Sequence, residues 1–117
     1  MRKEDLRTPD YLQHMLDAVD RIRSYVAPLS LESFEATPMA IDAVVRNLEI
    51  IGEAARNIMR GDPEFAAAHP EIPWEAVYGM RNRVSHAYFS VDTSIVWSTV
   101  QTWVPELQQK LLNLQAE

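Results

Sequence analysis

The sequence contains no cysteine, which excludes disulfide bonds and cysteine-ligated metal sites. A chain without cysteine is compatible with a reducing compartment, and we expect a cytoplasmic protein. No apolar run approaches the roughly 20 residues that a membrane-spanning helix needs. The first ten residues, MRKEDLRTPD, have charges but no hydrophobic stretch after them, so we expect neither a signal peptide nor a membrane association.

Glycine and long polar tracts are also scarce. The 117 residues include three glycines, 47% are hydrophobic, and the chain shows no internal repeat. This composition is sufficient for a compact core and argues against disorder. The length predicts one domain over residues 1–117.

Basic residues are outnumbered by acidic ones. Eleven Lys and Arg face seventeen Asp and Glu, which gives a net charge of −6. Such a charge opposes a broad coating of nucleic acid. Any binding of nucleic acid must therefore rest on a local basic patch.

Apolar residues recur at steps of three and four, the period of amphipathic helices, and no segment alternates with the period of a strand. Long helices are predicted at residues 8–26, 38–60, from 73 onwards and at 92–114, with short helical turns at 30–35 and 66–68. Thr8 is the expected cap of the first helix. Pro105 should kink the last helix, because proline removes one backbone hydrogen bond. Four main helices with short connections predict an all-α fold, an antiparallel up-and-down helical bundle.

The apolar stripes of these helices predict the core. In the first two long helices the stripes consist of Leu12, Met15, Leu16, Val19, Ile22 and Val26, and of Val44, Leu48, Ile51, Ala55 and Ile58. The last helix is expected to contribute Ile95, Val96, Val100, Val104, Leu107 and Leu111. In the third helix, Gly79 is expected to admit close packing.

One stretch, GMRNRVSHAYFSVD at residues 79–92, holds Arg81, Asn82, Arg83, His86 and Tyr88 within eight positions. Arginine is a permanently charged fork that suits phosphate oxygens, and histidine transfers protons near neutral pH. The cluster therefore predicts a site that cleaves or transfers a phosphodiester. The other interpretation is a helix C-terminus at which arginine and histidine cap free carbonyls.

Helix geometry tests this cluster. At about 100° per residue, Asn82 and His86 share a face, so Asn82 can orient the imidazole if the helix runs through His86. Arg81 and His86 would lie roughly 140° apart, so Arg81 reaches the same point only if the helix ends nearby or a second chain completes the site. No metal-spaced histidine pair, glycine-rich phosphate loop or nucleophilic serine motif is present, and we expect neither a metal nor a cofactor.

A charged stripe follows the second long helix and consists of Arg46, Glu49, Glu53, Arg56 and Arg60. One interpretation is a solvated face with Arg46–Glu49 and Glu53–Arg56 pairs, each worth about 0.2–0.5 kcal/mol. The other places Arg46 and Glu53 beside the Arg81–His86 cluster as supporting residues.

The run from Arg81 through His86 to Tyr88 resembles the R-x4-H-x-Y signature of the HepT family within the HEPN superfamily. Further segments resemble that family in the same order: Tyr11-Leu12 with Met15-Leu16, VVRNLEIIGEAA at 44–55, IPW at 72–74, GMRN at 79–82 and VDTSIVW at 91–97. The resemblance covers nearly the whole chain.

This resemblance implies an endoribonuclease that acts without metal as the toxin of a toxin–antitoxin system. HEPN ribonucleases are typically homodimers with a composite cleft, and the antitoxin of this family is an MntA-type nucleotidyltransferase. That enzyme adds AMP to the motif tyrosine, which is Tyr88 in this sequence. The substrate is then an RNA, with transfer RNA as one candidate.

Metal-free RNA cleavage needs a base for the 2′-hydroxyl, an acid for the leaving oxygen and positive charge for the phosphorane. His86 can serve as the base and Arg81 can hold the phosphate, with Arg83 nearby as a supporting cation. Because the cluster has one histidine, a two-fold dimer is expected to supply both acid and base. The rival interpretation is a non-catalytic helical module for dimerisation or partner binding, in which Tyr88 is a half-buried aromatic at a helix junction.

Overall fold

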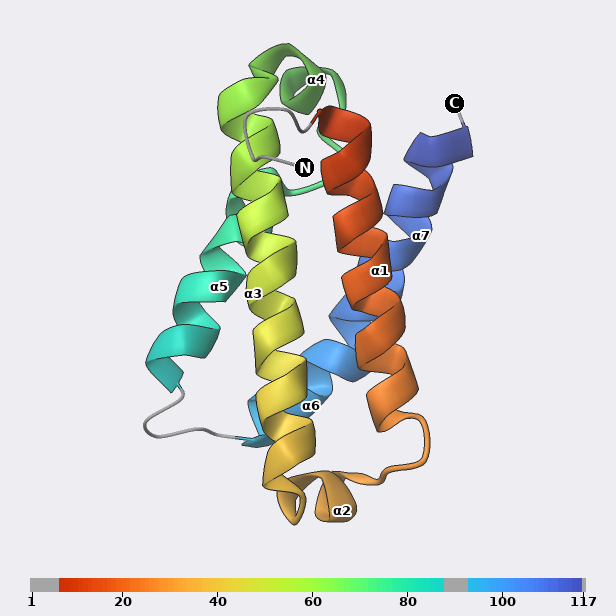
Figure 1. The fold of residues 1–117 in the computed structure, drawn as a ribbon, viewed down its shortest axis with the longest axis vertical. Coiled ribbons are helices and arrows are strands. Elements are labelled where there is room, and N and C mark those ends of the chain that lie inside the picture. Colours follow the sequence, from red (N-terminus) through yellow and green to blue (C-terminus); the bar gives the residue numbers. More distant parts are fainter. Residues whose placement is uncertain (1–6, 88–92, 117) are drawn as a thin grey trace.

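Every regular element in residues 7–87 and 93–116, the parts of the chain that the computed structural model describes, is helical. The elements are α1 (Thr8–Val26), α2 (Leu31–Glu35), α3 (Pro38–Gly61), α4 (Pro63–Ala68), α5 (Trp74–Ala87), α6 (Thr93–Ser98), the π-helical η3 (Thr99–Trp103) and α7 (Val104–Ala116). Figure 1 shows α3 at the centre, with α5 along one side, α1 along the other and α7 next to α1. Successive main helices run in opposite directions, which confirms the all-α up-and-down bundle.

The first turn of α1 is fixed by two acidic side chains. The Arg7 backbone N–H donates to the Asp10 carboxylate at 2.8 Å and makes Arg7 the N-cap, so the prediction of Thr8 as the cap was wrong by one residue. The Thr8 hydroxyl instead donates to the Asp62 carboxylate at 2.7 Å. Since Asp62 also accepts from the Phe65 N–H in α4, one carboxylate joins the start of α1 to the α3–α4 junction.

The apolar stripes predicted for α1 and α3 are confirmed, because all of their residues are buried. A polar contact also crosses this interface at the buried Asn47. The Arg21 Nε donates to the Asn47 side-chain oxygen at 2.8 Å, and the Asn47 amide donates to the Ala43 carbonyl at 2.8 Å. The buried amide therefore has partners for both of its ends, as buried polar groups require.

The connection between α3 and α5 contains more helix than predicted. The helix α4 begins at Pro63, a residue favoured in the first turn, and Asp62 caps it. At Gly79 in α5, an added Cβ would meet no atom of the described residues within 4 Å, so the expected close packing at this glycine was wrong for this part of the chain.

The sequence predicts a kink at Pro105 in the last helix. The structure instead divides this helix into α6 and α7 by the π-helical turn η3, which comes just before the proline. The Val104 N–H donates to the Thr99 carbonyl five residues back, so η3 precedes the proline, which has no N–H to donate. Figure 1 shows that α6 and α7 run in different directions. The predicted core residues of this run are buried except Ile95, which is exposed because it lies one position away from the stripe that begins at Val96.

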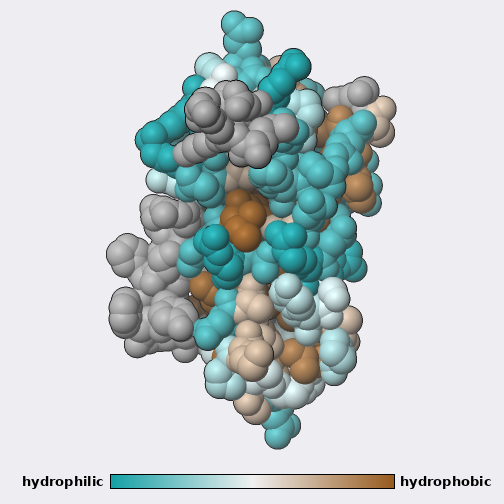
Figure 2. Space-filling model, viewed as in Figure 1, coloured by the Kyte–Doolittle hydropathy of each residue, from teal (hydrophilic) through white to brown (hydrophobic). Residues whose placement is uncertain are grey.

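The surface differs between the two ends of the bundle. In the view of Figure 2, hydrophilic residues dominate the upper part, whereas apolar and weakly polar residues gather in the lower part. The lower part corresponds to the end where α2, the start of α3 and α6 lie in Figure 1.

Candidate active site

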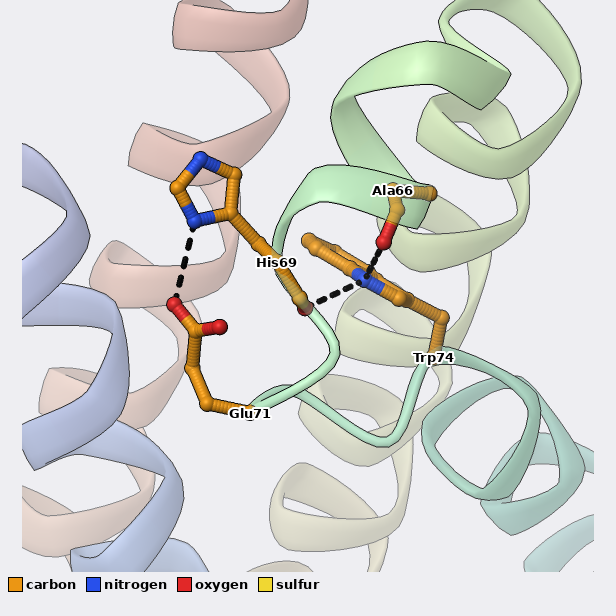
Figure 3. Close-up of polar contacts among 4 residues, drawn as sticks. All are labelled: Ala66, His69, Glu71 and Trp74. Carbon is orange, nitrogen blue, oxygen red and sulfur yellow. Dashed lines mark hydrogen bonds and ion pairs between the residues drawn. The ribbon is translucent and has the colours of Figure 1, made fainter.

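The helix that carries the Arg81–His86 run is anchored at its start by Trp74. Figure 3 shows the indole N–H of Trp74 pointing at two carbonyl oxygens, those of Ala66 and His69, each 3.1 Å away. The ring is buried and lies edge-on to Phe65, with centroids 6.2 Å apart. The first turn of α5 is therefore held against α4 by one side chain.

A polar contact between His69 and Glu71 lies in the segment that connects α4 to α5. His69 follows α4 as the predicted loop residue, and its Nδ1 lies 3.0 Å from the Glu71 carboxylate (Figure 3). The pKa of Glu71 is lowered from its ordinary value, first by a hydrogen bond from its own backbone and then by the hydrogen bond with His69. This contact belongs to the connection before α5 and lies outside the predicted cluster.

The charged stripe of α3 forms both predicted pairs. Arg46 and Glu49 lie 3.9 Å apart, and Arg56 and Glu53 lie 3.4 Å apart. Their surroundings differ along the helix, because the Arg46 side chain is 71% exposed whereas that of Arg56 is only 27% exposed. The stripe is therefore a solvated face at Arg46 and becomes partly covered toward Arg56.

The cover at Arg56 comes from α5. The Arg56 guanidinium carbon lies 6.0 Å from the centre of the Tyr78 ring, at the outer limit of a cation–π contact. Among the described residues, the buried Nε of Arg56 has no hydrogen-bond partner, so the guanidinium is held by Glu53 and the ring. Sequence periodicity does not predict this contact, because it joins residues of two helices.

The Arg56–Tyr78 contact also fixes the register of α3 against α5. The two helices run antiparallel (Figure 1), and each advances about 1.5 Å per residue. Each step along α5 beyond Tyr78 is thus matched by one step back along α3 from Arg56. The α5 backbone at position 81 is therefore about level with Glu53, and at position 86 it is about level with Leu48.

The predicted site residues fall into two groups. Arg46 and Glu53 are described with their side chains, as above. Arg81, Asn82, Arg83 and His86 lie on the helical backbone of α5, but their side chains, like the whole of Tyr88, lie outside the described residues. The helix runs through His86. Positions 82 and 86 therefore share a face of α5, and positions 81 and 86 stay about 140° apart around it.

The described residues contain neither a metal-binding cluster nor a membrane-spanning helix. Within residues whose side chains are described, no group of three His, Cys, Asp or Glu residues is placed to hold a metal ion. No described helix is both long enough and apolar enough to cross a membrane.

Comparison with known proteins gives the family. The family model described as "Ribonuclease HepT-like" matches residues 15–114. A protein named "Probable ribonuclease HepT" from Thermococcus cleftensis is 39% identical over 105 residues, which cover 90% of this chain and 93% of that protein. A "Putative RNase" from Caldanaerobacter subterraneus subsp. tengcongensis is 37% identical over 107 residues, covering 91% of this chain and 93% of the relative.

A "Putative RNase" from Methanocaldococcus jannaschii is 31% identical over 111 residues, 95% of this chain and 97% of the relative. No solved structure gives a significant match. The family match spans α3 and α5 together, which are the two helices that bear the charged stripe and the Arg81–His86 run. The chain belongs to the HepT-like ribonuclease family.

Proposed function

We propose that the chain is an endoribonuclease that cleaves RNA without a metal ion, using Arg81 and His86. The observation that supports this most is the R-x4-H run, carried on a continuous helix in a member of a ribonuclease family. His86 takes the proton of the 2′-hydroxyl as it attacks the neighbouring phosphate. Arg81 holds the phosphate oxygens by two parallel hydrogen bonds and offsets the charge that develops on them.

Three neighbours support these two residues in the proposal. Asn82, four positions from His86 on a continuous helix, orients the imidazole. Arg83 and Arg46 add positive charge where an acidic chain needs it to attract RNA. Glu53 is about level with position 81 and balances the charge of the arginines, as it already does for Arg56.

The proposed active form is a homodimer. Because α5 is helical through position 86, Arg81 and His86 of one copy diverge by about 140° around one helix. A second copy related by a two-fold axis brings two Arg81–His86 pairs to one cleft. One histidine then acts as the base while the other protonates the leaving 5′-oxygen.

We further propose that this ribonuclease is the cytoplasmic toxin of a toxin–antitoxin pair. The antitoxin is a nucleotidyltransferase that transfers AMP from ATP to the Tyr88 hydroxyl: the tyrosine oxygen bonds to the α-phosphorus, and pyrophosphate and the phenolic proton leave. The added phosphodiester brings bulk and a negative charge two positions from His86, so it competes with RNA for Arg81.

The activity is tested by incubating the purified protein with total RNA in EDTA. His86→Ala should lower the rate by a factor of about 10²–10⁴, as for the loss of a general base, and Arg81→Ala should abolish cleavage. Asn82→Ala should have a smaller effect. His14→Ala is the matched control, because His14 is exposed on α1, far from the motif in sequence.

Cleavage at the wild-type rate by His86→Ala or Arg81→Ala contradicts the proposed roles, and so does a requirement for a divalent ion. If no variant and no wild-type protein cuts RNA, the chain is a non-catalytic helical module.

Control through Tyr88 is tested separately, by co-expression with an MntA-type nucleotidyltransferase. Intact-mass measurement should show one added AMP on the wild type and none on Tyr88→Phe. Tyr88→Phe should keep ribonuclease activity and escape inhibition, because it lacks only the acceptor oxygen. Equal labelling of both proteins would contradict the assignment of Tyr88.

A further inference from the structure

Three large apolar side chains stay exposed at one end of the bundle. They are Met39 at 83%, Ile95 at 54% and Leu31 at 37% exposure, on α3, α6 and α2. These elements lie together at the lower end of Figure 1, where the Phe34 and Trp97 rings, with centroids 5.3 Å apart, join α2 to α6. Apolar and weakly polar surface gathers in the same part of Figure 2. We call Leu31, Met39 and Ile95 the apolar end.

Among the described residues, the segments that form the apolar end carry charges of one sign. Residues 24–45 and 93–109 contain no Lys, Arg or His, although the chain has eleven Lys and Arg elsewhere. Glu32 and Glu35 on α2 and Asp42 on α3 are exposed around it. The first basic residue along α3 is Arg46, one turn beyond Asp42, where the charged stripe begins. The apolar end and the proposed RNA site therefore have opposite electrostatic characters.

This combination selects among possible occupants. Single exposed apolar residues are common, but apolar residues grouped inside a rim of one charge mark interaction sites. RNA and anionic membranes are both repelled by an acidic rim. A second copy docked by this end about a two-fold axis would place acidic rim against acidic rim. A protein surface with apolar side chains flanked by Lys or Arg complements both features.

We propose that the apolar end is the docking surface for the nucleotidyltransferase that modifies Tyr88. This inference rests on the proposed function. Tyr88 is five positions before Thr93, the first residue of α6, and five extended residues span at most about 18 Å. An enzyme seated on α2, α3 and α6 is thus within reach of the acceptor tyrosine.

The test uses charged substitutions at exposed positions, which leave the core in place. Met39→Glu and Ile95→Glu, combined in the full-length chain, should weaken binding of the purified nucleotidyltransferase at least 100-fold by isothermal titration calorimetry. AMP transfer to Tyr88, followed by intact mass, should slow in parallel. Ribonuclease activity of the free variant should equal that of the wild type, which also verifies its fold.

The matched control is Leu112→Glu. Leu112 is 45% exposed on α7, whose last turns lie near the opposite end of the bundle in Figure 1. This variant should bind and be labelled like the wild type. A second variant, Glu32→Lys with Asp42→Lys, should also weaken binding, most strongly at low salt, because it reverses the rim charge.

Wild-type binding and labelling of the Met39→Glu/Ile95→Glu protein would overturn the docking surface while the regulation by AMP stands. An equal loss in Leu112→Glu would overturn it too. If the wild-type chain itself is neither bound nor labelled, the proposed regulation fails and the docking surface fails with it. The failure of the docking surface and the failure of the proposed regulation are distinguishable, because only the second leaves the wild-type chain without added AMP.

Discussion

The indole of Trp74 should contribute to stability through its N–H as well as its ring. In Trp74→Phe the aromatic face against Phe65 is kept in part, but the carbonyls of Ala66 and His69 lose the indole donor and keep only their backbone donors. A hydrogen bond of this kind contributes about 0.5–1.5 kcal/mol net, and the lost ring atoms leave a small cavity at a buried position. Together we expect the free energy of unfolding to fall by about 1.5–3 kcal/mol.

Urea denaturation followed by far-UV circular dichroism measures this change, and the melting temperature should fall by roughly 5–15 °C. Trp103→Phe is the matched control, because Trp103 packs partly buried against the core and donates no hydrogen bond within the described residues. A loss below about 0.5 kcal/mol in Trp74→Phe, or an equal loss in both variants, would refute the role of the N–H.

Three further changes probe the bundle. Phe34→Ala should lower the free energy of unfolding, measured by urea denaturation, by about 3–5 kcal/mol, because the Phe34 ring on α2 is fully buried and packs against Trp97 on α6. A loss below about 1 kcal/mol would contradict this packing. Gly79→Ala should raise stability by about 0.5–1 kcal/mol, since it removes a helix-interior glycine whose added Cβ would meet none of the described residues, and a destabilised variant would contradict that geometry. The lowered pKa of Glu71 means that its contribution is present above the ordinary value of 4.5 and is lost as pH falls through the folded value. Glu71→Gln should therefore differ from the wild type in a pH series above that range and converge with it at lower pH; a constant difference would show that the carboxylate does not act by its charge.

Most of the fold could be predicted from local patterns. The steps of three and four in the first two long helices identify their buried stripes, because each helix turns one apolar face toward the core. The departures occur where tertiary contacts compete with local signals. Thr8 leaves its expected capping role to bind Asp62, 54 positions away, and the turn before Pro105 widens into η3. Ile95 lies one position away from the buried stripe of α6 and stays exposed.

For the candidate site, the sequence predicts residue types but not their arrangement. Arg81 and His86 are proposed from their spacing and from the family, whereas the level of Glu53 and Leu48 beside α5 follows from the Arg56–Tyr78 contact. That contact joins positions 22 apart across two helices, and no periodicity within one helix encodes it. The two ion pairs of α3 were predictable because partners three apart share a helix face.

The central claim, metal-free cleavage through the 2′-hydroxyl with His86 as the base, is tested most directly by the ends of the RNA products. Wild-type protein in EDTA should give fragments with a 2′,3′-cyclic phosphate and a 5′-hydroxyl, measured by mass spectrometry on a short synthetic RNA. A matched substrate with a 2′-deoxy nucleotide at the cleavage position should stay intact, and His86→Ala should leave both substrates uncut. Products with a 3′-hydroxyl and a 5′-phosphate, or cleavage of the deoxy substrate, would contradict the mechanism.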